Sequence, residues 1–187
     1  MPNRKPTKDE LLAAAGRTVP DLIAPNLEVL FCGINPGLYT AAVGHHFARP
    51  GNRFWPTLHR AGFTDRLLAP SEEHKLLGLG YGIASLVARA TASAAELSNE
   101  EYVDGGRTLE EKVRRYRPRC VAFLGVGAYR VAFNRRQAVI GRQEERLGDS
   151  LVWVLPNPSG LNANYQLEDL TRLFRQLHLY LDETRGR

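Results

Sequence analysis

The sequence has little of what marks secreted or membrane-bound proteins. It contains only two cysteines, Cys32 and Cys120, each inside an apolar stretch, which favours reduced thiols in a cytosolic protein over a disulfide framework. No apolar run approaches the roughly 20 residues of a membrane-spanning helix, and the polar start of the chain has no apolar segment typical of a secretory signal. We therefore expect a cytoplasmic protein without a membrane partner.

The excess of one sign of charge is also small. The 187 residues include 25 Lys+Arg and 20 Asp+Glu, which leaves a net charge of +5. This mild excess suits a polyanionic partner but does not establish one. The length fits one domain of ordinary size, so we expect residues 1–21 to form a loosely ordered leader and residues 22–187 to form a single domain.

The chain alternates between strand-like and helix-like patterns. Apolar runs typical of buried strands cover residues 27–32, 120–125 and 151–155, with a weaker run at 83–87. Helical spacing covers residues 9–15, 52–61 (with Asn52 as its cap), 106–116 and 167–181, and residues 135–148 resemble an inserted hairpin. This order predicts an α/β fold of three layers, with a central, mostly parallel sheet flanked by helices. Ligands of such folds bind beyond the carboxyl ends of the strands.

The loop after the first strand reads Gly33-Ile34-Asn35-Pro36-Gly37. Asn35 can donate and accept hydrogen bonds but cannot take up a proton. The loop could cradle a phosphate, yet it lacks the Lys-Ser/Thr of a P-loop and the spacing of a dinucleotide fingerprint. Taken alone, it favours a sharp exit from the strand.

A second polar segment follows, with His45 and His46 side by side. Neighbouring side chains on an extended chain point in opposite directions, and no Cys or carboxylate stands at ligand spacing, so we expect no metal site and no cofactor. Phe47 lies in a polar loop rich in glycine and proline, with Arg49 and Arg53 downstream. An exposed aromatic in such a setting can stack on a nucleic-acid base.

The loop after the last strand carries an apolar residue, Leu161, in a polar and turn-forming stretch. Such a side chain either folds back onto the core or acts as a wedge between base pairs. Ser159 and Gly160 would let backbone N–H groups approach phosphates. Asn157 is expected to anchor the loop or to contact a nucleic-acid backbone.

Four motifs together resemble a known family. They are Phe-Cys-Gly-Ile-Asn-Pro-Gly at 31–37, Asn-Arg-Phe-Trp at 52–55, Ala-Gly-Phe-Thr-Asp at 61–65 and Leu-Pro-Asn-Pro-Ser-Gly-Leu at 155–161. In this order they look like the mismatch-specific uracil/thymine-DNA glycosylases, a branch of the uracil-DNA glycosylase superfamily. The resemblance covers the chain from about residue 22 to the C-terminus.

The resemblance implies a monofunctional DNA glycosylase of base-excision repair. It would flip uracil, and thymine or a related base as a further candidate, out of a G mismatch in double-stranded DNA and hydrolyse the N-glycosidic bond to leave an abasic site. We also expect a monomer, because one domain can engage a duplex without a partner, in a bacterial-type cytosol or nucleoid.

The roles that the resemblance implies fall into three groups. Asn35 would position the attacking water. The base pocket would be formed by Gly33, Ile34, Thr40, Phe47 and Asn157, with Phe47 stacking on the flipped base. DNA contacts would come from Ser159, Gly160, the wedge Leu161 and Asn162. The positive charges of Arg49 and Arg53, which flank the proposed base-stacking loop, and of Arg89, which follows position 88, are expected to add further DNA contacts.

One position departs from the family pattern. Ala88 stands where an acidic catalytic residue is expected, at the end of the weaker strand. Without that carboxylate we expect reduced activity, which aspartate at 88 should raise. The alternative is a weakly active or inactive form of the same fold that binds damaged DNA. An unrelated nucleotide-binding α/β protein is disfavoured by the missing phosphate-loop lysine.

Overall fold

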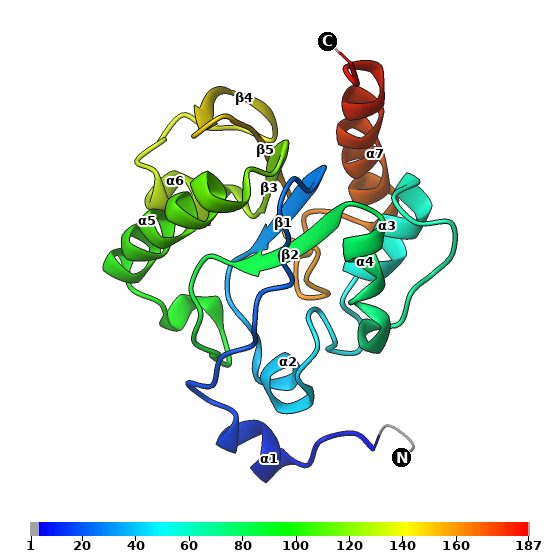
Figure 1. Ribbon diagram of the computed structural model, residues 1–187. Helices are drawn as coiled ribbons and strands as arrows, with labels where there is room; N and C mark the ends of the chain where they lie inside the picture. The colour runs from blue at the N-terminus through cyan, green and yellow to red at the C-terminus, as the bar shows by residue number, and fades with distance from the viewer. Residues whose placement is uncertain (1–3, 187) are drawn as a thin grey trace.

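The computed structural model describes residues 4–186 (Figure 1). Residues 1–3 of the expected leader lie outside the described residues. The helices and strands, with η for short 3-10 helices, are α1 (Lys8–Ala13), β1 (Val29–Gly33), α2 (Leu38–Val43), α3 (Phe54–Ala61), η1 (Pro70–Glu72), α4 (Lys75–Gly78), β2 (Tyr81–Ser85), η2 (Ala94–Glu96), α5 (Asn99–Tyr116), β3 (Cys120–Leu124), α6 (Val126–Ala132), β4 (Gly141–Leu147), β5 (Ser150–Leu155) and α7 (Leu167–Glu183).

The strands form one sheet in the order β2-β1-β3-β5-β4. β1 pairs in parallel with β2 and β3, and β3 pairs in parallel with β5. Only β4, at the outer edge, runs antiparallel to its neighbour β5. The expected hairpin is therefore confined to β4 and β5, while residues 135–140 form no strand. The four parallel strands all end at the same edge of the sheet.

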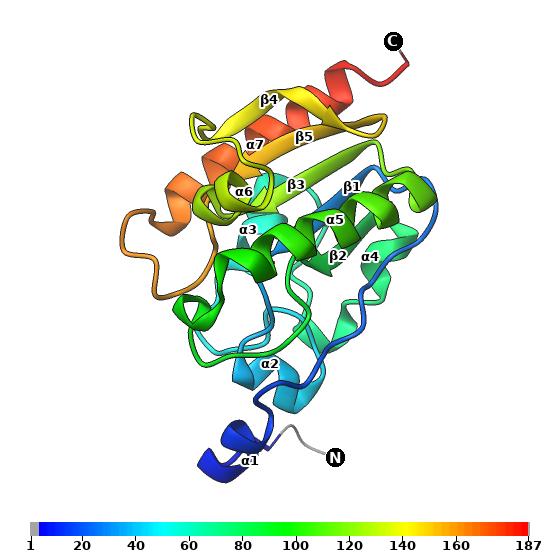
Figure 2. The ribbon, with the colours of Figure 1, turned by 90° about the vertical axis from the view of Figure 1, so that its left-hand side faces the viewer.

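Helices cover both faces of the sheet (Figure 2). Alternate residues of β1 face opposite ways because side chains alternate across a strand. Phe31 packs with Phe54 of α3 and Phe174 of α7, whereas Cys32 packs with Leu109 of α5 and Tyr129 of α6. The predicted three-layer α/β fold, with its mostly parallel central sheet, is confirmed.

Helix α3 begins at Phe54 with Arg53 as its cap, which corrects the expected cap Asn52. The ranges of β2 and α5 also differ from those expected, because both elements contain glycines. β2 begins at Tyr81 and ends at Ser85, so residues 86–91 form a loop rather than the end of a strand. Helix α5 begins at Asn99, seven residues earlier than expected, although it contains Gly105 and Gly106. A Cβ on Gly105 would lie 2.1 Å from the carbonyl oxygen of Leu86. Glycine is needed here because the helix passes against the loop that follows β2.

The expected leader packs against that same loop. The N–H of Gly16 donates to the carbonyl of Ala90 at 2.9 Å, and the N–H of Ala90 donates to the carbonyl of Arg17 at 2.8 Å. Ala14 and Val19 are buried. This part of the leader therefore lies closer to the rest of the chain than the sequence suggests, while the proposed boundary at residue 22 stays a prediction. Within residues 4–186, no helix has the length and apolar character needed to cross a bilayer.

Candidate nucleic-acid interface and base pocket

A cavity of about 310 Å³ opens at the carboxyl ends of the parallel strands. Its wall is formed by residues at the end of β3 and by residues at and after the ends of β1, β2 and β5, as expected for a parallel α/β sheet. Of the predicted site residues, it is lined by Gly33, Ile34, Asn35, Thr40, Phe47, Arg49, Asn157, Ser159 and Leu161. The fold thus brings the two loops of the sequence motifs together around one hollow.

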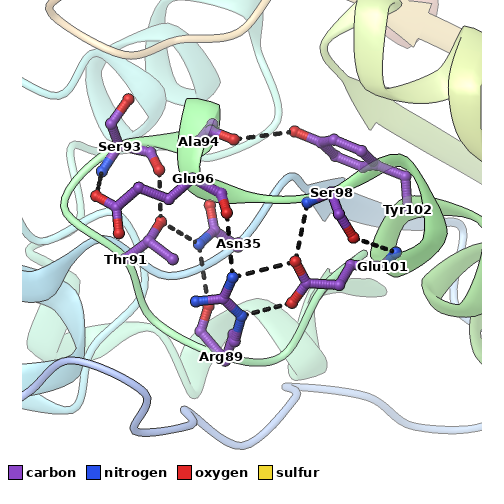
Figure 3. Close-up of polar contacts among 9 residues, drawn as sticks. All are labelled: Asn35, Arg89, Thr91, Ser93, Ala94, Glu96, Ser98, Glu101 and Tyr102. Carbon is purple, nitrogen blue, oxygen red and sulfur yellow. Dashed lines mark hydrogen bonds and ion pairs between the residues drawn. The ribbon is translucent and has the colours of Figure 1, made fainter.

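Asn35 is held by the loop after β2 (Figure 3). Its Nδ2 donates to the carbonyl of Arg89 at 3.0 Å and to Oγ1 of Thr91 at 2.8 Å. The Thr91 hydroxyl donates in turn to the carbonyl of Ser93 at 2.8 Å, so it can only accept from Asn35. These contacts fix which way the amide is turned. Within residues 4–186, no group donates to its Oδ1, which remains available to a ligand in the cavity.

Phe47 packs against the hydrophobic core. Its ring stacks on Phe54 with centroids 4.1 Å apart, and it is half-buried in the cavity wall. The backbone takes a left-handed conformation at Phe47 (φ 53°), which is uncommon for an aromatic residue. A Cβ on Gly33 would lie 3.3 Å from the ring, so glycine at the end of β1 gives Phe47 its place.

The loop after β5 is braced internally. Oδ1 of Asn157 accepts from the N–H of Ser159 at 2.9 Å, and Nδ2 of Asn162 donates to the carbonyl of Asn157 at 3.0 Å. A Cβ on Gly160 would lie 2.6 Å from the carbonyl oxygen of Gly51, so the loop needs glycine to approach residues 49–52. Leu161 nevertheless points outward and is 74% exposed. It does not fold back onto the core.

The family model described as the uracil DNA glycosylase superfamily matches residues 20–178. The chain belongs to this superfamily. Superfamily members are DNA glycosylases, hydrolases that act on DNA. The chain is also similar to the solution NMR structure of a protein from Methanosarcina acetivorans that is proposed to be a uracil DNA glycosylase. The TM-score is 0.58 at 21% identity, over 87% of this chain and 98% of the other. At this identity the likeness concerns the fold.

Among residues 4–186, no aspartate or glutamate lines the cavity. Ala88 does not line the cavity, and its side chain is exposed. This corrects the expectation that position 88 belongs to the catalytic site, because β2 ends at Ser85, three residues before it, and the loop turns this residue outward. The Ala88-based alternative of an inactive, damage-binding form therefore has no support.

Replacement of Ala88 by aspartate tests this correction. We expect the single-turnover rate of uracil excision to change by less than about threefold, since a carboxylate outside the cavity can neither activate water nor face the sugar. Quenched-flow excision from a G·U duplex measures the rate. A tenfold increase would restore position 88 to the catalytic site.

Arg53 is a further correction. It is half-buried and turned inward, where it donates to the carbonyls of Tyr165, Ser159 and Asn162. It therefore holds the loop after β5 and is not a free DNA contact. Arg49, by contrast, is exposed at the cavity rim, and its guanidinium has no partner within residues 4–186.

These two arginines make a matched pair of variants. Arg53→Met should lower the free energy of unfolding by about 2–3 kcal/mol, because it leaves three carbonyls without their charged donor. Arg49→Met should change it by less than about 0.5 kcal/mol but should weaken DNA binding and reduce the salt slope by about 0.9. Urea unfolding and DNA titrations at several salt concentrations measure the two effects. Equal stability of the two variants would contradict this assignment.

The side chain of Arg89 also has a partner within the protein, since its guanidinium forms an ion pair with Glu101 at 2.5 Å. The expectation that it contacts DNA is not supported by this geometry. Ser159, Gly160 and Leu161 lie at the cavity and its rim, so their DNA contacts stay predictions. Asn162 is a brace of the loop, and its contact with DNA is likewise a prediction.

Several cavity residues were not singled out as site residues from the sequence. They are His46, Asn52, Ser85, Thr91 and Ser93. His46, for which the sequence disfavours a metal role, is buried, and its Nε2 lies 2.9 Å from the carbonyl oxygen of Pro20. Ser85 ends β2, and Thr91 and Ser93 lie in the loop after it, so the place of these residues depends on where that strand ends. Within residues 4–186, no group of three or more His, Cys, Asp or Glu side chains is placed to hold a metal ion.

Proposed function

We propose that this superfamily member is a mismatch-directed glycosylase that excises uracil opposite guanine. The observation that carries the proposal is the juxtaposition of a fixed Asn35, a supported Phe47 and an exposed Leu161 around one cavity. Its volume, about 310 Å³, lies at the small end of ligand sites, which span roughly 300–1,000 Å³. A single base suits it.

Base flipping would begin at the rim. An exposed apolar side chain such as Leu161 can occupy the space that a flipped base leaves in the duplex. Opening a pair costs a few kcal/mol, least for a mismatch, so a G·U pair would be selected by its weaker pairing. The positive charge of Arg49, beside Leu161, would attract the DNA backbone.

Excision would then proceed in the cavity. The base would stack on Phe47, and the bond between uracil N1 and the sugar C1′ would break, with both bonding electrons leaving on the uracil. Main-chain N–H groups at the end of β1 would stabilise the developing charge on the uracil O2. Oδ1 of Asn35 would accept a hydrogen bond from the water that attacks C1′. Asn35 cannot take the proton that this water loses, so the proton passes to bulk solvent as the uracil anion departs, and we expect slow turnover.

A cleavage assay on defined DNA tests the proposal. Four substrates carry the target in a G·U pair, an A·U pair, a G·T pair or single-stranded uracil DNA, and alkali cuts the strand at each abasic site. We expect G·U to react fastest and A·U at least tenfold slower. The G·T arm tests whether the cavity accepts the extra methyl group of thymine. Equal rates on G·U and A·U would refute mismatch direction, and no cleavage of any substrate would refute the glycosylase itself.

A further inference from the structure

Arg89 lies where three parts of the structure meet (Figure 3). Its carbonyl accepts the hydrogen bond from Nδ2 of Asn35 at 3.0 Å. Its guanidinium donates to both carboxylate oxygens of Glu101, at 2.5 and 3.0 Å, and to the carbonyl of Glu96 at 3.2 Å. Its backbone forms an antiparallel bridge with Thr18. The backbone of Arg89, whose carbonyl holds Asn35, is therefore itself fixed by Thr18 on the backbone side and by Glu101 through the side chain.

Glu101 is a firm anchor for this arginine. It lies in the first turn of α5, where its carboxylate accepts the N–H of Ser98 at 2.9 Å and its own N–H donates to Oγ of Ser98 at 3.2 Å. The side-chain hydrogen bond from Arg89 lowers the pKa of Glu101 to about 2. The carboxylate is thus ionised at neutral pH, and the pair would be lost only as the pH falls towards that value.

The main effect of the Arg89–Glu101 pair is on the orientation of the Arg89 side chain rather than on the stability of the fold. The side chains of Arg89 and Glu101 are 41% and 30% exposed, and ion pairs open to water contribute little to folding. A guanidinium that meets a carboxylate through two hydrogen bonds does, however, have a defined orientation. The flanking residues, Ala88 and Ala90, have no polar side chain that could do the same.

We propose that Arg89 and Glu101 form a positioning pair for base excision. The pair fixes the carbonyl of Arg89, this carbonyl fixes Nδ2 of Asn35, and Oδ1 of Asn35 is thereby presented to the attacking water. Neither residue touches the DNA. The inference rests on the proposed role of Asn35, and it assigns to Arg89 a task different from the phosphate contact expected from the sequence.

Two variants and their combination test the pair. Arg89→Met removes the guanidinium, and Glu101→Gln removes the charge while it retains an acceptor for Ser98. We expect each to lower the single-turnover excision rate about tenfold, with the Kd for a G·U duplex within about twofold of the parent. The double variant should be no slower than the slower single variant, because both changes break one unit. Glu110→Gln, which breaks the exposed Arg114–Glu110 pair on the same helix, should leave the rate unchanged.

A second readout does not depend on activity. The side-chain amide of Asn35, identified by its loss in Asn35→Ala, should have an NMR order parameter of roughly 0.85 in the parent and below about 0.6 in Arg89→Met and Glu101→Gln. If the parent excises no base, the glycosylase proposal fails while the amide signal still decides on the pair.

Either of two results would overturn the inference. One is an unchanged Asn35 order parameter and rate in both variants. The other is weaker DNA binding in Arg89→Met alone, with a salt slope reduced by about 0.9, which identifies a phosphate contact.

Discussion

Replacement of Asn35 by alanine is expected to slow uracil excision by roughly a hundredfold to a thousandfold, the scale of losing a positioned catalytic group. The variant loses Oδ1, which orients the water, and Nδ2, which ties the loop after β1 to Arg89 and Thr91. DNA affinity should change little, because the rim residues Arg49 and Leu161 are untouched. Single-turnover excision and DNA titration separate these effects.

The control for this variant is Gln176→Ala, which removes a similar amide from the exposed face of α7. It should excise uracil at the parent rate. Thermal unfolding of both variants shows whether a slow Asn35→Ala enzyme is still folded. A folded Asn35→Ala variant with the parent's rate would remove Asn35 from the catalytic site.

Replacement of Leu161 by alanine is expected to slow excision from duplex DNA by about tenfold to a hundredfold. The loss corresponds to the few kcal/mol that an inserted side chain offsets when a base pair is opened. On single-stranded uracil DNA the same variant should remain within about threefold of the parent, because there is no stack to open. The ratio of the two rates is the measurement.

Leu179→Ala provides the comparison, since Leu179 is an exposed leucine, at 51%, on α7. It should leave both rates unchanged. Because Leu161 is 74% exposed, its removal creates no cavity in the core, and the free energy of unfolding should stay within about 0.5 kcal/mol. An equal loss on duplex and single-stranded DNA would show that Leu161 is no wedge.

The sequence predicts those parts of the fold that depend on local pattern. Strands β1, β3 and β5 are apolar on both faces, so each reads as a continuous run that ends in a turn. The predicted range of β2 was two residues too late in the sequence, because glycine, here Gly82, is unfavourable in a strand. A Cβ on Gly82 would lie 2.4 Å from the carbonyl oxygen of Leu22, and a contact with a residue so distant in sequence leaves no local signal.

The same limit applies to the site. Asn35, Phe47 and Leu161 line one cavity, because the parallel strands that precede their loops all end at one edge of the sheet. The direction of an arginine side chain is different. Arg53 meets carbonyls more than 100 residues away, and Arg89 meets Glu101 across a loop and a helix start. Composition gives their charge, but only the tertiary structure shows that this charge is used inside the protein.

The two outermost strands of the sheet have a consequence for association. On the outer side of β2, the backbone N–H and C=O of Ile83 form hydrogen bonds with the backbone C=O and N–H of Leu22, each at 2.8 Å. β4, at the other border, has an irregular register between Arg142 and Arg146 and carries charged side chains there. Covered backbone groups, bulges and charges are the features that discourage strand-to-strand growth between molecules. Both borders of this sheet therefore carry features that discourage edge-to-edge pairing between molecules.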